Sequence, residues 1–377
     1  MPKRGKSPRK APINLGLALE CDKGLLGVIV VLVVLGMIMT YSASAVKGML
    51  YYSDQYHFFK MQLLWVALGV AAMVIAMKVD IRLLWKWAKV LFMVSLVLLI
   101  LVKAPGLGRS VNGANRWIGL GPLSIQPSEV IKLSIVIMVA KVLSQTRDFT
   151  AFRRGMLPSL ALLGLVLVLV MLQPDLGTSL VIMATVCIML VAAGARVKHL
   201  AMLGGVGLGL VVAAIAAAPY RMQRIFAYID PWADPAGSGY QTIQSLLALG
   251  PGGVFGLGLG QSRQKFLYLP ENHTDFIFAM IGEELGFIGG IFVIGVFAFL
   301  IWRGFRVAMH VRDPFLSLLA AGFTSLIGVQ AMINMGVVTG LLPVTGITLP
   351  FLSYGGTSLI FTMAGAGLLL NVSREVS

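Results

Sequence analysis

The sequence predicts an all-α polytopic membrane protein of about ten transmembrane helices, with a large extracytoplasmic loop between helices 7 and 8. Of the 377 residues, 58% are hydrophobic and only 12% are charged, whereas a soluble domain carries about 25% charged residues. The apolar residues form separate blocks of the length that a helix needs to cross a bilayer. A membrane barrel would need alternating ten-residue strands, and the sequence has none. Helices remain, because they satisfy their own backbone hydrogen bonds in lipid.

Ten apolar blocks define the expected helices. The third is short unless the amphipathic segment 83–89, whose tryptophans suit a membrane interface, extends it. Pro127 suits the first turn of the fourth helix, where a missing N–H costs nothing. The blocks fall at about 24–43, 61–77, 90–102, 127–143, 156–173, 176–194, 200–218, 276–302, 315–338 and 353–370.

Lysine and arginine set the expected orientation. The chain has 30 basic and 15 acidic residues, and a cytoplasmic N-terminus places most of the basic ones on the inner side, as the positive-inside rule requires. Both termini are then cytoplasmic. We expect a basic tail over 1–23, one transmembrane domain over 24–371 and a short tail over 372–377. Since topology and anionic lipid account for the charge, no nucleic-acid partner is implied.

Three outer loops are longer than a plain helical bundle needs. They cover residues 103–126, 219–275 and 339–352, and the second is rich in aromatic residues. Loops beyond about 12–15 residues are usually functional or disordered, and an aromatic-rich loop is not disordered in composition. Function is therefore expected at the outer face. The last loop, with its Pro and Gly residues, suits either a re-entrant stretch along a lipid tail or a stiff connector.

The densest polar cluster lies just before the eighth helix, where Glu271, His273 and Asp275 fall within five residues. Thr274 or Asp275 could cap that helix, but capping explains only one acid. Ionisable groups at an apolar boundary are costly to keep, which favours function. Three mixed ligands could also hold Mg²⁺ or Mn²⁺; the alternative, in which His273 is only a polar loop residue, is equally compatible.

A second cluster combines Arg116 with Glu129 and Lys132 at the start of the fourth helix. Glu129 and Lys132 are spaced i,i+3 and can neutralise each other. Charged pairs in a membrane segment usually face a wet cavity. Arg116 and Lys132 together would form a cationic pocket for an anionic, phosphorylated headgroup.

Several segments together resemble the SEDS family of polytopic peptidoglycan glycosyltransferases (shape, elongation, division and sporulation). They span nearly the whole chain in the family's order. Within the family, Gly256–Gly260, Tyr268–Glu271 and Gly282–Gly286 look more like the division-type members than the elongation-type members. The matching segments are Asn112–Trp117, Gln126–Glu129, Gln173–Thr178, Gly239–Gln241, Gln244–Ser245, Tyr268–Phe278, Gly282–Gly286 and Leu349–Gly356.

The resemblance implies polymerisation of lipid II into glycan strands outside the cytoplasmic membrane, at the division septum. It implies a divalent cation, Mg²⁺ or Mn²⁺, for which Glu271 and Asp275 are the candidate ligands. It also implies a class B penicillin-binding protein, an FtsI-type transpeptidase, and other divisome membrane proteins as partners. The family's essential acid falls on Asp275, and the expected substrate-binding residues are Arg116, Glu129, Lys132, Gln244, Ser245, Lys265, Glu271 and His273.

The residues suit this chemistry. The diphosphate of an undecaprenyl-linked sugar is already a good leaving group, so cations that absorb its charge suffice there. The acceptor hydroxyl needs one carboxylate base, and apolar surroundings raise the pKa of an aspartate above its usual value of about 3.9. Asp275, next to Phe276 and Phe278, fits that role. One base with cationic support predicts inversion at the anomeric carbon and release of undecaprenyl diphosphate.

Two alternative functions belong to classes other than enzymes, namely a transporter and a structural protein. A lipid II flippase would use Glu129, Lys132, Asp175 and Glu283 as a transmembrane polar path, although Asp175 could merely cap the following helix. The long outer loop after the seventh span has no earlier counterpart, which speaks against an inverted-repeat transporter. A structural scaffold of the division complex is the weaker alternative, because the acids between 271 and 275 would then have no role.

Overall fold

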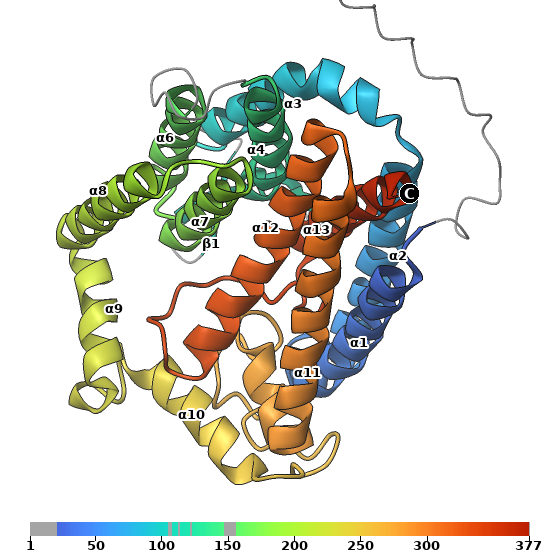
Figure 1. Cartoon of the computed structure of the whole chain (residues 1–377). Coiled ribbons are helices and arrows are strands. Elements are labelled where there is room, and N and C mark those ends of the chain that lie inside the picture. The colour runs from blue at the N-terminus through green and yellow to red at the C-terminus, as the bar shows by residue number, and fades with distance from the viewer. Residues whose placement is uncertain (1–20, 105–107, 112–113, 121–122, 147–155, 377) are drawn as a thin grey trace, which may run out of the picture.

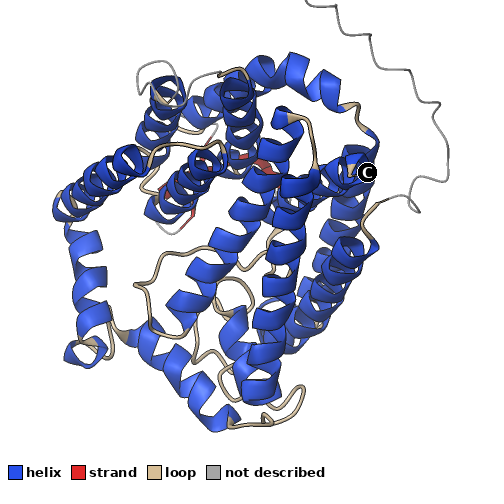
Figure 2. Ribbon diagram, viewed as in Figure 1, coloured by secondary structure: helices blue, strands red, loops and turns tan. Residues whose placement is uncertain are grey.

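The computed structural model describes residues 21–104, 108–111, 114–120, 123–146 and 156–376. Helices dominate this part of the chain, and the strands are confined to one short stretch (Figures 1 and 2). The helices are α1 Lys23–Tyr52, α2 His57–Lys78, α3 Ile81–Leu101, α4 Pro127–Ser144, α6 Leu157–Met171, α7 Leu176–Ala192, α8 Val197–Ala216, α9 Pro219–Ile229, α10 Tyr240–Gly252, α11 Ile277–His310, α12 Pro314–Val338 and α13 Gly356–Val372.

Each of the ten apolar blocks coincides with one helix, which confirms the predicted all-α class. By length and hydropathy, six helices of the described chain can cross a membrane: α1, α2, α3, α11, α12 and α13, the last counted to Glu375. A seventh span results if α8 and α9, which are bent by 105° with respect to each other, are counted as one. Helices α6 and α7 are apolar but shorter, and α4 carries three charged residues. The expected number of ten spans remains a prediction.

Aspartates begin four of these helices. Asp22, Asp80, Asp175 and Asp313 each accept a hydrogen bond from a backbone N–H in the first turn of α1, α3, α7 and α12. Such bonds satisfy donors that have no partner within the helix. The capping alternative for Asp175 is therefore confirmed. Pro127 begins α4, as its missing N–H predicts.

The loop between α3 and α4, the first of the expected outer loops, folds into a small antiparallel sheet that the sequence did not predict. Its strands are β1 Gly108–Val111, β2 Ala114–Leu120 and β3 Leu123–Ile125, in the order β1-β2-β3. Residue Trp117 of β2 pairs with position 109, and Ile118 pairs with Ile125. The sheet leads directly into α4 and so brings β2 to the beginning of that helix. Asn112 and Gly113, the first residues of the Asn112–Trp117 motif, lie outside the described residues.

The long outer loop over 219–275 is also structured. It contains α9, a short 3-10 turn at Pro231–Ala233 and α10. In Figure 1, α9 and α10 (yellow) lie at the end of the helix bundle away from the C-terminus. The amphipathic helix α9 is attached to the segment after α12 by two bonds: Arg224 Nη1 donates to the Val344 carbonyl at 3.1 Å, and the Tyr228 hydroxyl donates to the Leu341 carbonyl at 3.1 Å.

Helix α11 is interrupted at Gly286, where φ is +68°. The glycine-rich tract between 250 and 260 fills the break: the Leu257 N–H donates to the Glu283 carbonyl at 3.0 Å, and the Phe287 N–H donates to the Gly253 carbonyl at 2.9 Å. A Cβ on Gly256 would lie 2.2 Å from the Glu284 carbonyl oxygen, so only glycine allows this approach. The tract thus pairs the backbone groups that the broken helix leaves free.

The segment between α12 and α13 passes through the protein interior. Leu349, Phe351 and Leu352 are buried, and Gly36 of α1 lies against the backbone of this segment. Its buried part therefore contacts protein, which favours the stiff-connector alternative. At the opposite end of the molecule the two described termini meet: the Asp22 N–H donates to the Ser373 hydroxyl at 3.0 Å, so they lie on the same side.

Candidate active site

A polar cavity of about 410 Å³ lies where β2, the first turns of α4 and α7, helix α9, residues 271–275 and the segment after α12 meet. Seven charged side chains line it, three basic and four acidic. Charged groups kept within an apolar protein usually serve function. The seven are Arg116, Glu129, Lys132, Asp175, Arg224, Glu271 and Asp275.

Asp275 stands directly before α11, and its half-buried carboxylate lines the polar cavity. The N-cap of α11 is Phe276, and no side chain caps the helix. Capping by Thr274 or Asp275, one of the alternatives from the sequence, is therefore wrong. Within the described chain the carboxylate accepts no hydrogen bond, and Gly346 is close enough that a Cβ there would lie 3.6 Å from Asp275 Oδ2.

The surroundings make Asp275 a much weaker acid than usual. Burial and, to a smaller extent, the negative charge of Glu271 raise the pKa of its carboxyl group, the cation Arg224 opposes the shift, and the net result is a pKa of about 7. Desolvation penalises the charged form, and a like charge acts in the same direction. A carboxyl group that titrates near neutral pH can accept a proton at one step and release it at the next.

Three successive backbone carbonyls hold the residues around Asp275 in place. The side-chain amide of Asn334 on α12 donates to the Asp275 carbonyl at 2.7 Å. The Ser353 hydroxyl donates to the Thr274 carbonyl at 2.6 Å, and the Tyr354 N–H donates to the His273 carbonyl at 2.9 Å. The position of the carboxylate is therefore set by α12 and the segment before α13, far along the chain from 275.

Glu271 is oriented toward the same cavity by a local turn. Its backbone adopts φ +53°, and its carbonyl accepts hydrogen bonds from the N–H groups of Thr274 and Phe276 at 3.2 Å each. The Thr274 hydroxyl donates to Glu271 Oε2 at 2.8 Å. A non-glycine residue with positive φ is uncommon and clusters at functional sites.

The predicted Glu129–Lys132 pair forms at the wall of the polar cavity. Lys132 Nζ lies 2.8 Å from Glu129 Oε2, and both side chains are buried. Lys132 also donates to Gln330 Oε1 of α12 at 2.8 Å. Gln330 in turn donates to the Thr348 carbonyl at 3.0 Å. The lysine thus joins α4 to α12 while its positive charge stays beside the cavity.

The other two cations are attached to backbone carbonyls. Arg116 donates through Nε to the Gln173 carbonyl at 3.0 Å and through Nη2 to the Pro174 carbonyl at 2.6 Å. Arg224 approaches from α9 and is held by Val344. Arg116, Lys132 and Arg224 therefore reach one cavity from three separate segments. Arg116 and Lys132 line it together, as the sequence predicts, but four acids share the cavity with them, and the binding of an anionic headgroup there stays a prediction.

Four residues of the predicted set lie elsewhere. His273 is buried next to the rings of Phe58 and Tyr354, with ring centroids at 4.9 and 5.5 Å. Burial and the nearby Lys47 lower its pKa to about 3, so the imidazole is neutral. The other three are Lys265, which donates to the Gly260 carbonyl, Ser245, whose hydroxyl donates to the Val338 carbonyl at 2.8 Å, and Gln244, which is half-buried; none of the four lines the polar cavity.

The three-ligand metal alternative is not supported. Among the residues that the structure describes, no three His, Cys, Asp or Glu side chains are placed to hold an ion together. His273 packs between aromatic rings, whereas Glu271 and Asp275 line the polar cavity. These two carboxylates remain the candidate ligands.

Glu283 and Glu284 accept hydrogen bonds from the loop before α11 and from α1. Glu283 accepts from the Arg263 N–H at 2.7 Å and from the Ser262 hydroxyl at 2.5 Å. Glu284 accepts from the Ser42 hydroxyl of α1 at 2.6 Å. Neither acid lines the polar cavity, so the polar path of the flippase alternative does not include Glu283.

Sequence reasoning missed three residues of the site. Arg224 could have been found as a cation on the amphipathic segment 219–229, but nothing in the sequence assigns it to Asp275 rather than to solvent. Gln330 and Asn334 are single polar residues, four positions apart on the largely apolar helix α12. That spacing places both on one face of the helix. It indicates that this face meets a polar neighbour, but it does not identify the neighbour.

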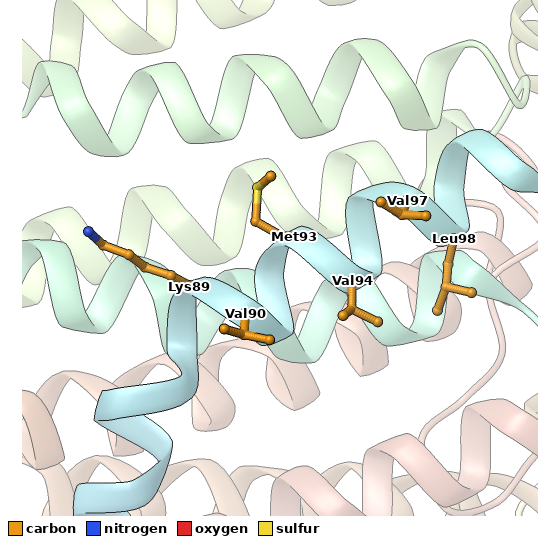
Figure 3. Close-up of a pocket in the computed structure, with 6 residues that line it drawn as sticks. All are labelled: Lys89, Val90, Met93, Val94, Val97 and Leu98. Atoms are coloured by element: carbon orange, nitrogen blue, oxygen red, sulfur yellow. The ribbon is translucent and has the colours of Figure 1, made fainter.

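A separate apolar hollow of about 360 Å³ runs along α3 (Figure 3). Lys89, Val90, Met93, Val94, Val97 and Leu98 line it, all from one helix, and it shares no residue with the polar cavity. Met93 and Val97 are 60% and 50% exposed. Exposed apolar side chains on a spanning helix are those expected to face lipid.

Known proteins resemble this chain over almost its whole length. A family model described as cell cycle protein, of the FtsW, RodA and SpoVE type, matches residues 23–377. Stage V sporulation protein E of Bacillus subtilis is 52% identical over 344 residues, covering 91% of this chain and 94% of the relative. A protein of Geobacter sp. (strain M18), named probable peptidoglycan glycosyltransferase FtsW, is 44% identical and covers 92% of this chain and 95% of its own.

Solved structures of other proteins also align with almost the whole chain. A chain from a peptidoglycan synthase complex, described as coordinating polymerization and crosslinking, aligns with a TM-score of 0.77 at 34% identity, over 94% of this chain and 98% of its own. The rod shape determining protein RodA of Thermus thermophilus aligns with a TM-score of 0.69 at 31% identity, over 94% and 97%. The predicted family and helical membrane fold are thereby confirmed: the chain belongs to the FtsW, RodA and SpoVE family of cell cycle proteins.

Proposed function

We propose that this protein is a peptidoglycan glycosyltransferase that polymerises lipid II at the outer face of the cytoplasmic membrane, with Asp275 as the general base. Several family relatives carry the name peptidoglycan glycosyltransferase, which supports the enzyme class. The observation that carries the assignment is a carboxylate without a hydrogen-bond donor among the described residues, in a cavity with three cations. A plain structural acid would be capped or paired.

In the proposed reaction the ionised Asp275 carboxylate accepts the proton of the acceptor sugar's hydroxyl group. The hydroxyl oxygen forms a bond to the anomeric carbon of the donor sugar. The bond from that carbon to the diphosphate oxygen breaks, and the diphosphate keeps the electron pair. Displacement on the face opposite the leaving group inverts the anomeric carbon. The proton then leaves Asp275 for solvent, which a pKa of about 7 allows.

The three cations suit the leaving group. Arg116 and Arg224 present guanidinium groups, which match phosphate oxygens in a two-pronged geometry. Lys132 adds a point charge but shares it with Glu129 at 2.8 Å. Preorganised cations in a site with little water stabilise charge that develops on the departing diphosphate.

A divalent cation, Mg²⁺ or Mn²⁺, would be held by Glu271 and Asp275 on the protein side. Two carboxylates are too few for an all-protein cage, but they fit the way in which Mg²⁺ binds through one or two carboxylates together with substrate phosphates. When bound, such an ion would neutralise the diphosphate. Residues Glu271 and Asp275 line one cavity, which supports this placement.

We further propose that the protein acts at the division septum with an FtsI-type class B penicillin-binding transpeptidase and other divisome membrane proteins, and that both termini are cytoplasmic. The related solved complex combines polymerization with crosslinking, which supports a crosslinking partner. The 52% identity to a protein named for stage V of sporulation favours a second setting for the same chemistry, the wall made during sporulation. Deletion of the gene distinguishes the two, because it would block either vegetative division or only spore formation.

The deciding experiment reconstitutes the purified full chain with lipid II, with and without its transpeptidase, in Mg²⁺ or EDTA. We expect polymer from the wild type, and from Asp275→Asn a rate lower by at least about 10²-fold. Lipid II confined to one leaflet tests transport in the same vesicles. Translocation of the headgroup without polymer would refute the enzyme and favour a flippase.

A further inference from the structure

A second cavity of about 420 Å³ adjoins the polar cavity beneath α9 and the start of α10, and we call it the side cavity. Arg224, Gln241 and Val344 line both cavities, so the two share a wall. The remaining lining of the side cavity includes Tyr220, Gln223, Tyr240 and Thr242. A volume of this size lies within the range of about 300–1,000 Å³ typical of sites for small ligands.

The chemistry of the side cavity differs from that of the polar cavity. Arg224 is its only charged lining residue, at the shared wall, and all its other polar side chains are neutral. Gln223, Tyr240, Gln241 and Thr242 make no side-chain hydrogen bond to any residue that the structure describes. Thr242 is buried, Tyr240 and Gln241 are half-buried, and Gln223 is exposed. A buried polar group normally has a partner, so the Thr242 hydroxyl is available to a ligand, and the other three side chains can exchange solvent for one.

The walls of the side cavity are held in place before any ligand binds. Asp234 fixes the turn before α10, because its Oδ2 atom accepts from the Ser238 N–H at 2.8 Å and its carbonyl accepts from the Gly239 N–H at 3.0 Å. On the opposite wall, Arg224 and Tyr228 attach α9 to the segment after α12. A preformed site loses less ordering entropy when it binds a ligand.

We infer that the side cavity binds sugar units of the lipid-linked substrate while the polar cavity binds its diphosphate. This inference rests on the proposed glycosyl transfer and adds a saccharide subsite to it. Amide and hydroxyl groups match the hydroxyl and acetamido groups of amino sugars, and the ring of Tyr240 offers an amphipathic face with a polar tip. Because the two cavities share a wall, one ligand can place its charged part among the cations of the polar cavity and its neutral part in the side cavity. A sugar diphosphate has such a charged end and such a neutral end.

The test compares two probes that share the lipid diphosphate: lipid II, which carries the disaccharide with its stem peptide, and undecaprenyl diphosphate, which carries neither. Equilibrium binding is measured with the full chain in nanodiscs, in an Asp275→Asn background that prevents turnover. The test variant combines Tyr240→Leu and Thr242→Val, and the control is Tyr268→Leu, an exposed outer-loop tyrosine that lines neither cavity. We expect the test variant to bind lipid II about tenfold more weakly, as the loss of one or two hydrogen bonds implies, and undecaprenyl diphosphate as before. The control should bind both probes as the parent does.

Equal weakening for both probes, or no weakening for lipid II, would overturn the saccharide subsite. These outcomes do not depend on turnover, so they are separate from failure of the proposed function, which shows as polymer made by Asp275→Asn at the wild-type rate. A third probe, a lipid-linked tetrasaccharide, distinguishes the growing strand from the lipid II monomer as the source of the sugars. Greater weakening for the tetrasaccharide assigns the side cavity to the strand, and equal weakening assigns it to the monomer.

Discussion

Asn334 on α12 donates its side-chain amide to the backbone carbonyl of Asp275 at 2.7 Å and to the carbonyl of Ile347 at 2.7 Å. The asparagine is buried. One side chain thus joins the residue proposed as base to the segment after α12, which also lines the polar cavity. The geometry of the carboxylate therefore depends on a residue 59 positions along the chain, and this makes the site sensitive to changes that touch no substrate.

Replacing Asp275 with Asn should abolish polymerisation. The amide keeps the shape of the side chain but cannot accept the proton, so we expect a loss of about 10²–10⁴-fold, the usual contribution of general base catalysis. The measurement is the initial rate of glycan formation from lipid II. Asp230→Asn is the matched control, since Asp230 only caps the turn at Pro231–Ala233 and an asparagine can do the same; the control should keep wild-type activity.

Activity should rise with pH through about 7. The base works only when ionised, and burial together with Glu271 raises the pKa of Asp275 to about 7. Glu271→Gln removes the like charge, so the pKa of Asp275 should fall and the rising limb of the rate profile should move to lower pH. Rates measured between pH 5.5 and 8.5 (a range of about 1.5 units on either side of that pKa) test this. A shift to higher pH would contradict the assignment.

The same raised pKa has a consequence for stability. The folded chain holds the Asp275 proton more tightly than the unfolded chain, whose value is 3.8, so ionisation of Asp275 destabilises the fold as pH rises from about 4 through 7. Asp275→Asn removes that cost. We therefore expect its Tm in nanodiscs to be at least that of the wild type at pH 8, with the difference vanishing at pH 4. A lower Tm at pH 8 would show that the carboxylate is structural.

Asn334→Ala should lower kcat about 10–100-fold, because misplacing a catalytic group by a small distance can have effects of this size, while KM for lipid II stays nearly unchanged. Asn371 provides the control: its amide also donates to two backbone carbonyls, those of Ala76 and Val79, at 3.0 and 2.7 Å. Asn371→Ala should destabilise the protein similarly without changing kcat. If both variants lose activity in proportion to stability, Asn334 is structural rather than a positioning residue.

Lys132→Met should destabilise the protein by about 3–5 kcal/mol, because it leaves the buried Glu129 carboxylate without its partner. The double variant Glu129→Gln, Lys132→Met removes both charges and should recover most of that loss. Chemical denaturation in detergent measures both. Recovery of stability without recovery of activity would show that the Lys132 cation serves the reaction, whereas full recovery of both would contradict a role for its charge.

Gly286→Ala should be strongly destabilising. Its φ of +68° is unfavourable for alanine, and the new Cβ would lie 2.3 Å from the Gly256 nitrogen. Gly295 lies on the same helix, and a Cβ added there would meet no atom within 4 Å, so Gly295→Ala should be neutral or stabilising by up to about 1 kcal/mol. Thermal unfolding of the two variants measures the contrast. Similar Tm values for both would contradict the close contact between α11 and the glycine tract.

The sequence by itself determined the helices and singled out the acids that line the polar cavity. Blocks of apolar residues must become helices in lipid, and all ten did; Pro127 marked the start of α4, and the acids near 271–275 stood out against an apolar background. These properties are local, because they follow from the composition and spacing of neighbouring residues. The Glu129–Lys132 pair could be predicted for the same reason, since an i,i+3 spacing fixes two side chains on one helix face.

Only the tertiary structure decided which polar residues meet. His273 lies two residues from Asp275 yet packs between aromatic rings. Arg224 and Gln330 come from distant helices to line the polar cavity, and Asn334 reaches the Asp275 carbonyl. Three segments of the loop between α3 and α4 form strands that pair with one another. The glycine tract forms backbone hydrogen bonds with the interrupted helix α11. Such contacts depend on how elements pack across long separations in the chain, and no local pattern encodes the partner that a lone polar residue on an apolar helix will find.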